Sequence, residues 1–321
     1  MEPVLIICFI FSFFISLFII PSWIHRAKKS GLFGKDINKS YDTNVAEVGG
    51  IPVLTGFIAG ILMYVALRTF YFSDASFSLE LMALVACILI AAIVGFVDDV
   101  LGWKIGLRQR EKPILTLLAA LPIMVVNAGH SIIYLPFLGN VDFGLVYPLV
   151  FVPIAIIGAS NAYNMLAGLN GLEAGMGMII LTALGLKAFM TNQGWVAMIC
   201  LVMLFALLPF YFFNHFPAKI FPGDTLTYAL GALIACVAIF GNLERMALIL
   251  FIPYFIEFIL KARTKFKGQS YGIPQKNGNL LSPSRISSLT HVALIFTKKE
   301  RSAVYLLYLF EIALAGLVLL I

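Results

Sequence analysis

The stretch Leu-Glu-Leu-Met-Ala-Leu-Val-Ala-Cys-Ile-Leu-Ile-Ala-Ala-Ile-Val-Gly-Phe-Val-Asp-Asp (residues 79–99) is almost entirely apolar and ends in two adjacent carboxylates. A helix of about 20 apolar residues crosses the hydrocarbon core of a bilayer. The whole chain shares this character, because 61% of its 321 residues are hydrophobic, 12% are charged and the mean hydropathy is +0.99. Soluble domains are far less apolar, so the composition predicts an all-α polytopic membrane protein.

Similar apolar runs recur along the chain and predict about ten transmembrane helices. They fall near residues 3–24, 50–68, 79–97, 113–129, 145–162, 171–191, 195–213, 225–241, 244–260 and 303–321. The first run lacks a preceding basic stretch and a following small-residue cleavage pattern, so we expect a retained helix rather than a signal peptide. An even number of spans places both termini on the same face. We expect a single integral membrane domain over residues 1–321.

The basic residues predict the orientation. All but three of the 22 Lys and Arg residues lie in loops that follow odd-numbered spans, and the exceptions are Arg68, Lys187 and Arg245. Short loops rich in Lys and Arg stay in the cytoplasm. Both termini are therefore expected outside, with the odd loops in the cytoplasm. These basic loops suit either anionic lipid headgroups or substrate phosphates.

One cytoplasmic loop, residues 261–302 before the last span, is long enough to fold. Asn277-Gly278 is typical of a two-residue hairpin turn. Apolar residues then repeat at helical spacing; they are Ile286, Leu289, Val292, Ala293 and Phe296. We expect a small cytoplasmic excursion here, with a helix lying along the membrane surface.

Asp98 and Asp99 end the third span, where the helix dipole disfavours negative charge. A positive group should therefore compensate them. Adjacent residues on a helix diverge by roughly 100°, so we expect the two carboxylates to have different roles. The simpler alternative is that they only anchor the helix end against Lys104 or Arg108.

Residues 161–177, Asn-Ala-Tyr-Asn-Met-Leu-Ala-Gly-Leu-Asn-Gly-Leu-Glu-Ala-Gly-Met-Gly, combine asparagines with glycines in an otherwise apolar chain. Amide oxygens can ligate magnesium or bind a base edge without adding negative charge beside a pyrophosphate. Glycines allow a large ligand to approach the backbone. The alternative is that Gly171, Gly175 and Gly177 let helices pack closely.

Two further polar clusters lie at predicted cytoplasmic ends. Asp224 opens the eighth span, where a carboxylate binds a ligand or caps the helix. Lys35, Asp36 and Glu47 flank the first loop, where solvated charge is the ordinary interpretation. The predicted topology brings all these clusters to one face. Carboxylates, amides and cations together indicate magnesium-assisted phosphoryl transfer from a nucleotide, and the membrane setting implies a lipid acceptor.

Three motifs carry a resemblance to a known family. They are Val-Asp-Asp-Val-Leu at 97–101, the asparagine-rich run at 161–175 and Phe-Pro-Gly-Asp-Thr at 221–225. With the ten-span layout, they make the chain resemble the polyprenyl-phosphate N-acetylhexosamine-1-phosphate transferases over nearly its whole length. Bacterial branches usually carry aspartates where this chain has Ala167 and Asn170. The chain is therefore most similar to the dolichyl-phosphate N-acetylglucosamine-phosphotransferases of archaea and eukaryotes.

The resemblance implies a role for each matching residue. The metal ligands for Mg²⁺, or Mn²⁺ in its place, would be Asn164 and Asp224. The catalytic residues would be Lys112, which contacts the pyrophosphate, and Asp98 and Asp99, which face the lipid phosphate. Uracil would lie between Phe221 and Gly168 with Asn170 at its polar edge. The other substrate-binding residues would be Lys35, Glu47 and Asn161.

The chain departs from the family pattern in the long loop. Relatives carry a run rich in His and Arg before Ile-Pro, whereas this chain has Gln-Ser-Tyr-Gly before Ile273-Pro274. The resemblance therefore implies no role for a histidine at this position. Other cations of the loop would then contact the sugar, from among Arg263, Lys265, Lys267 and Arg285.

The implied reaction is attack of a dolichyl (polyprenyl) phosphate oxygen on the β-phosphorus of UDP-N-acetylglucosamine. It gives lipid-pyrophosphate-N-acetylglucosamine and UMP, the first lipid-linked step of protein N-glycosylation. The acceptor is largely dianionic at neutral pH, because its second pKa is about 6, and this favours direct in-line displacement. A route through an aspartyl phosphate is the alternative. We expect a multi-pass cell-membrane enzyme with its active site on the cytoplasmic face, in contact with membrane lipid and with no nucleic-acid partner. A homodimer is compatible with these features, and the sequence leaves the oligomeric state open.

Two other functions fit parts of the pattern. One is transfer of another UDP-N-acetylhexosamine sugar to the same kind of lipid. The other is secondary transport or lipid flipping, which predicts polar groups near mid-membrane. Glu257 and Glu311 lie within spans without an evident basic partner, whereas the dense polar motifs lie at one face. This distribution favours the enzyme.

Overall fold

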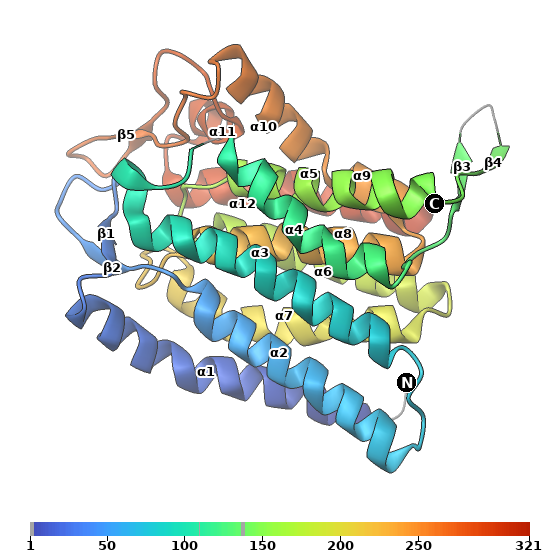
Figure 1. Cartoon of the computed structure of the whole chain (residues 1–321). Helices are drawn as coiled ribbons and strands as arrows, with labels where there is room; N and C mark the ends of the chain where they lie inside the picture. The colour runs from blue at the N-terminus through green and yellow to red at the C-terminus, as the bar shows by residue number, and fades with distance from the viewer. Residues whose placement is uncertain (1–2, 109, 136–138) are drawn as a thin grey trace.

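The computed structural model describes residues 3–108, 110–135 and 139–321. Long helices lie side by side in a bundle, with three short hairpins at its ends (Figure 1). Within these described ranges, eight helical segments are long and apolar enough to cross a membrane; they are Ile6–Lys29, Gly50–Tyr71, Ser78–Gly102, Tyr147–Met165, Leu172–Met190, Gly194–Asn214, Gly223–Gly241 and Glu300–Leu320. The predicted class, an all-α polytopic membrane protein, is confirmed.

These segments correspond to eight labelled helices with short flanking turns. The helices are α1 (Ile6–Lys29), α2 (Gly50–Ala66), α3 (Ser78–Ile105), α5 (Val152–Met165), α6 (Leu172–Met190), α7 (Gly194–Asn214), α8 (Gly223–Gly241) and α12 (Glu300–Leu320). The flanking turns are η1 (Pro3–Leu5), η2 (Leu67–Tyr71) after α2 and η3 (Tyr147–Phe151) before α5. The predicted and observed boundaries agree within a few residues.

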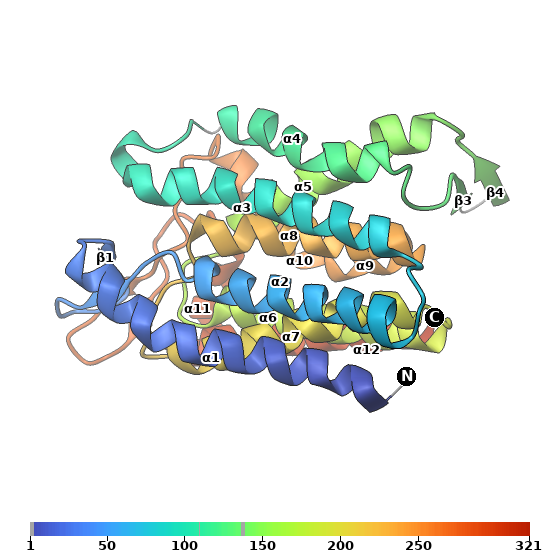
Figure 2. The same ribbon diagram turned by 60° about the horizontal axis from the view of Figure 1, so that its bottom comes forward.

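The other two predicted spans have a different form. The run at 113–129 is α4 (Glu111–Val125), whose 15 residues pack against α3 and α5 (Figure 2). The run at 244–260 is divided into α9 (Glu244–Leu250) and α10 (Ile252–Arg263). Pro253 lacks the N–H that would continue the helical hydrogen bonding, so the division falls beside it.

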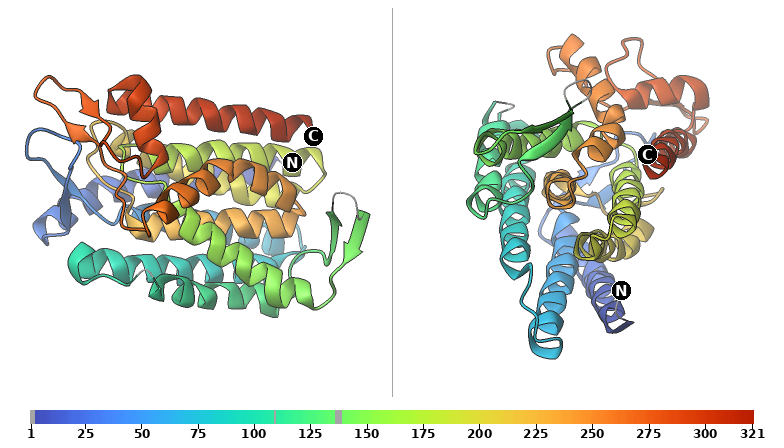
Figure 3. Two further views of the ribbon diagram at one scale, coloured as in Figure 1. Left: turned by 90° about the horizontal axis from the view of Figure 1, so that it is seen from above. Right: turned by 90° about the vertical axis from the view of Figure 1, so that its right-hand side faces the viewer.

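Helix α8 lies at the centre of the bundle, as the end-on view of Figure 3 shows. All its residues from Thr225 to Gly241 are buried. It packs against α2, α3, α5, α6 and α7. Gly231 makes the approach of α5 feasible, because a Cβ there would lie 2.5 Å from the carbonyl oxygen of Ala159. The first turn of α8 therefore opens at the centre of one end of the bundle.

That end carries two antiparallel hairpins, β1 (Phe33–Lys35) with β2 (Asn44–Ala46), and β5 (Ile273–Pro274) with β6 (Leu280–Leu281). We call it the site end. The third hairpin, β3 (Ile132–Leu135) with β4 (Gly139–Asp142), lies at the opposite end, where α1 begins and α12 finishes (Figure 1). The two chain ends thus lie on the same side of the bundle, as predicted.

The segment at 261–302 folds into the expected excursion, with the hairpin β5–β6 followed by α11 (Leu289–Thr297). Its turn is longer than the two residues predicted from Asn277-Gly278, because the pairing of the strands leaves residues 275–279 as the loop. The helix begins at Leu289 rather than near 286. Ser288 caps it by accepting a hydrogen bond from the N–H of Thr290.

Candidate active site

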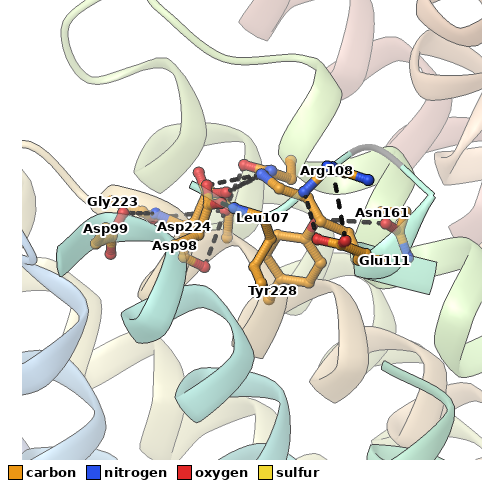
Figure 4. Close-up of polar contacts among 12 residues, drawn as sticks. Asp98, Asp99, Leu107, Arg108, Glu111, Asn161, Gly223, Asp224 and Tyr228 are labelled. Carbon is orange, nitrogen blue, oxygen red and sulfur yellow. Dashed lines mark hydrogen bonds and ion pairs between the residues drawn. The ribbon is translucent and has the colours of Figure 1, made fainter. Parts of the chain in front are cut away.

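Asp98 and Asp224 lie close together at the site end (Figure 4), and Lys112 pairs with both. Its Nζ lies 2.7 Å from Asp98 Oδ2 and 2.8 Å from Asp224 Oδ2. Asp98 Oδ1 accepts a hydrogen bond from the N–H of Leu107, which fixes the turn between α3 and α4. The expected compensating cation is therefore Lys112. Arg108 instead bonds to Glu111, and the side chain of Lys104 lies outside the described residues.

Asp99 points to a different partner, the start of α8. Its Oδ1 accepts a hydrogen bond from the N–H of Asp224 (2.7 Å), and its Oδ2 accepts bonds from the N–H and hydroxyl of Thr225 (3.0 and 2.6 Å). The first N–H groups of a helix have no partner within the helix, so Asp99 caps α8 from α3. The adjacent carboxylates thus have different contacts, as their angular separation predicts.

Helix α5 brings two asparagines to the same place. Asn164 Nδ2 donates to Asp224 Oδ2 (3.1 Å), and Asn164 Oδ1 accepts from Thr227 (2.8 Å). Asn161 Oδ1 accepts a hydrogen bond from the hydroxyl of Tyr228 (3.3 Å). If the Asn164 amide rotated by half a turn, its Oδ1 would lie beside Asp224 Oδ2. Its Nδ2 would then donate to the hydroxyl of Thr227, which can also accept a hydrogen bond.

This donor set fits a magnesium ion. Carboxylate and amide oxygens are the hard ligands that Mg²⁺ prefers. Asp98 and Asp224 already converge on one cationic group, the Lys112 ammonium. Among the described residues no three His, Cys, Asp or Glu side chains gather as a complete metal cage. Mg²⁺ in nucleotide sites commonly uses one or two carboxylates and completes its shell with substrate phosphates and water.

The backbone around Phe221 is held by the first loop. The N–H of Ala46 donates to the carbonyl of Lys219, the N–H of Phe221 donates to the carbonyl of Ala46, and the N–H of Gly49 donates to the carbonyl of Phe221. Glu47 lies within this ladder. Burial and the nearby Asp99 carboxylate raise the pKa of Glu47 above its usual range. The ladder therefore fixes Phe221 just before α8 and brings Glu47 near Asp99.

The first loop contributes a different lysine from the one expected. Lys35 is exposed and pairs with Asp42 at 3.0 Å. Lys39 is the buried cation, with its Nζ 3.0 Å from Asp36 and also paired with Glu300 at the start of α12. Sequence reasoning missed Lys39 and Glu300, because their pairing joins residues that are 261 positions apart.

The asparagine-rich run joins this charged cluster. Asn170 is buried; its Nδ2 donates to Asp36 Oδ2 and its backbone N–H donates to Glu300 Oε1, both at 2.9 Å. Gly168 has a φ of +107°, and its carbonyl accepts from Asn38 at 2.6 Å. The structure thus connects the run to the first loop and to α12.

Two of the glycines serve helix packing, the alternative interpretation of the run. A Cβ on Gly175 would lie 1.9 Å from the hydroxyl oxygen of Tyr308, and one on Gly177 would lie 2.6 Å from that of Tyr163. These positions therefore admit neighbouring tyrosines rather than a ligand.

The four cations expected from the long loop lie at its surface. Arg263 and Arg285 are exposed, and Arg285 bonds to the carbonyl of Arg263 at 3.5 Å. Lys265 and Lys267 are also exposed. Tyr271 of this loop does reach the asparagine-rich run, because its ring lies against Gly168.

One expectation about the buried glutamates was wrong. Glu257 does have a basic neighbour, because its Oε1 lies 3.6 Å from Lys261 Nζ, one turn further along α10. Glu311 has no hydrogen-bond partner for either carboxylate oxygen within the described part of the chain. The polar groups of the site end remain far denser than those at mid-bundle.

The fold and the site define an integral membrane protein whose helix ends gather carboxylates, amides and a lysine at one end. Residues 81–242 match the model of glycosyl transferase family 4. The chain belongs to this family.

Several relatives cover most of the chain. A Saccharolobus solfataricus protein with the provisional name UDP-N-acetylglucosamine–dolichyl-phosphate N-acetylglucosaminephosphotransferase is 40% identical, over 92% of this chain and 90% of its own. The Dictyostelium discoideum protein of the same name, without that qualification, is 27% identical over 83% and 70%. A phospho-N-acetylmuramoyl-pentapeptide-transferase of Halalkalibacterium halodurans is 32% identical over 78% and 79%.

Proposed function

We propose that this protein transfers N-acetylglucosamine-1-phosphate from UDP-N-acetylglucosamine to dolichyl (polyprenyl) phosphate, releasing UMP. The observation that carries the proposal is the joint placement of Asp98, Lys112, Asn164 and Asp224 at one end of membrane-length helices. The Saccharolobus and Dictyostelium relatives are named for these two substrates. The active site would face the cytoplasm, where the basic loops lie.

Each group of the site would perform one part of the chemistry. Asp224 and Asn164 would hold Mg²⁺, which supplies charge neutralisation on the pyrophosphate. The Lys112 ammonium, which is bonded to Asp224, would contact the pyrophosphate as well. Asp98 would lie beside the lipid phosphate and keep Lys112 oriented through their ion pair. The lipid phosphate is largely dianionic at neutral pH, so these residues need to offset charge more than to remove a proton.

The contacts of the carboxylates support direct displacement. Both oxygens of Asp99 accept hydrogen bonds from the first turn of α8. Asp98 is bonded through one oxygen to Lys112 and through the other to Leu107. A carboxylate whose lone pairs are engaged in this way is a weak nucleophile, which disfavours an aspartyl phosphate. The lipid phosphate oxygen would attack the β-phosphorus itself.

Base recognition would use Phe221, Gly168 and Asn170. Asp36 Oδ2 accepts a hydrogen bond from Asn170 Nδ2, and the amide oxygen Oδ1 is an acceptor. That oxygen can accept a hydrogen bond from the N3–H of uracil, which cytosine lacks. The Phe221 ring would supply a stacking surface for one face of the base, and the backbone at Gly168, which also contacts the Tyr271 ring, would lie at the other.

A radiolabel assay in detergent tests the function. Purified protein with polyprenyl phosphate, Mg²⁺ and labelled UDP-N-acetylglucosamine should give labelled lipid and UMP in equal amounts, and chelation should stop the reaction. A panel of UDP sugars identifies the donor, including the muramoyl-pentapeptide donor suggested by the bacterial relative's name. Substrate movement in reconstituted vesicles without UMP release would establish a transporter instead.

Phe221→Ala should raise the KM for the UDP sugar by about 5- to 150-fold, because stacking on an aromatic ring contributes about 1–3 kcal/mol. The KM for the lipid should hardly change. Asn170→Ala should lower the ratio of kcat/KM for uridine donors to kcat/KM for cytidine donors. Steady-state kinetics measure both effects, with Phe70→Ala, exposed at the opposite end, as the control. Normal donor kinetics with impaired lipid use would contradict the assignment.

A further inference from the structure

The segment 270–272 of the long loop lies across the asparagine-rich run. If Gly168 had a Cβ, it would be 3.1 Å from Tyr271 Cε1, so the phenol ring lies in contact with Gly168. The N–H of Gly272 donates to Asn38 Oδ1 (3.0 Å), while Asn38 Nδ2 donates to the carbonyl of Gly168 (2.6 Å). Tyr271 is thereby fixed to the backbone assigned to the donor base.

The surroundings of the phenol are acidic. Burial raises the pKa of Tyr271, and the nearby carboxylates of Glu173 and Asp224 raise it further, followed by those of Glu47 and Asp36. The hydroxyl is therefore a neutral hydrogen-bond donor at physiological pH. A neutral donor can contact a phosphate or sugar oxygen without adding charge to the site.

Helix α11 holds this segment from behind. His291, 2% exposed, donates from Nε2 to the carbonyl of Tyr271 (3.0 Å), and its Nδ1 accepts from the N–H of Ser287 (3.2 Å). Only the neutral ring with its proton on Nε2 makes both bonds. Thr290 donates to the carbonyl of Ser270 (2.7 Å). The ring of Tyr271 is thus tied to α11 through its own backbone.

The start of α11 is fixed in turn to the bundle. Glu257 of α10, fully buried, accepts hydrogen bonds at Oε2 from the N–H of Leu289 (2.6 Å) and the hydroxyl of Ser288 (3.0 Å). Lys261 of the same helix donates to the hydroxyl of Ser270 (2.7 Å). A continuous set of contacts therefore runs from α10 through α11 to Tyr271.

We propose that Tyr271 contacts the UDP-sugar donor and that His291 is a positioning residue that holds Tyr271 against Gly168. The inference rests on the proposed function. It assigns a donor contact to a neutral phenol of the long loop, whose expected contacts Arg263 and Arg285 are exposed.

Variants at Tyr271 test the contact. Tyr271→Ala should raise the KM for UDP-N-acetylglucosamine and the Kd measured by calorimetry by about 10- to 100-fold, because a hydrogen bond to a charged group and the ring contact are both lost. Tyr271→Phe should recover the ring contribution alone, and the KM for polyprenyl phosphate should stay unchanged. An unchanged donor KM in Tyr271→Ala would overturn the contact. A lower donor KM would show that the ring obstructs the site.

Variants at His291 test the positioning. His291→Ala should raise the donor KM and leave kcat within about threefold, whereas His291→Gln should restore the donor KM, because its amide can donate to the Tyr271 carbonyl. His130→Ala, at the opposite end, is the matched control. A loss of kcat, donor affinity and thermal stability together, without rescue by Gln, would assign His291 to the fold alone. If the wild-type protein does not turn over UDP-N-acetylglucosamine, the proposed function fails; if it does and the Tyr271 variants match it, only this inference fails.

Discussion

Asp224→Asn should lower turnover by about 100-fold or more while the protein still folds. The substitution removes a carboxylate from the position where Mg²⁺ and Lys112 would both be held, and metal stabilisation of a transition state amounts to several kcal/mol. Asp224 is central to the site geometry, since its Oδ2 binds both Lys112 and Asn164. Initial rates over a range of Mg²⁺ concentrations measure the effect, and size-exclusion chromatography in detergent monitors folding.

The matched control is Asp142→Asn, the same chemical change on the exposed hairpin at the opposite end. It should leave both turnover and magnesium dependence at the wild-type level. Asn164→Ala should resemble Asp224→Asn, because it removes the second proposed ligand. Normal turnover with normal magnesium dependence in both site variants would refute the metal assignment.

Gly223→Ala should reduce both thermal stability and turnover. Gly223 has a φ of +70°, and a Cβ there would lie 2.4 Å from Asp99 Oδ2. The left-handed conformation costs a non-glycine residue about 1–2 kcal/mol. Asp99 cannot move away cheaply, because its carboxylate accepts hydrogen bonds from the first turn of α8, each contributing about 1.5–3 kcal/mol. We expect a fall in melting temperature together with at least about tenfold lower turnover, since Asp224 is the next residue.

Gly278→Ala separates the two causes. Gly278 has a similar φ of +80°, but a Cβ there would meet no atom within 4 Å. The Gly278→Ala variant therefore has the backbone strain of a positive φ but no steric clash. Thermal unfolding of the two variants in the same detergent should show a clearly larger loss for Gly223→Ala. Equal losses would mean that the close approach of Asp99 does not constrain the site.

The class of fold followed from the sequence, because a hydrocarbon core of fixed thickness requires apolar helices of about 20 residues. The same constraint makes the polar residues near the helix ends conspicuous, so Asp98, Asp99, Asn164 and Asp224 were identifiable as a group. Helix periodicity could also separate the contacts of Asp98 from those of Asp99. Hydropathy predicted a single span at 244–260 and did not predict its division at Phe251, because the division depends on Pro253 within apolar sequence.

The partners of these residues needed the tertiary structure. Lys35 and Lys39 are equivalent cations in the sequence, and only the approach of α12 shows that Lys39 is the buried one, paired with Glu300. In the sequence, Tyr271 lies where the chain departs from the family's His- and Arg-rich run, so it was not identified as a site residue. The packing of α11 places its ring against Gly168.

The sequence by itself thus determined the class of fold and which polar residues lie at one end of the bundle. Only the tertiary structure decided which of those residues touch: Lys112 with Asp98 and Asp224, Asp99 with the start of α8, and His291 with the carbonyl of Tyr271. The physical reason is the separation in sequence of the residues that decide each property. Burial in lipid depends on the composition of a single segment, whereas a hydrogen bond or ion pair depends on two groups that separate helices bring together to within about 3 Å.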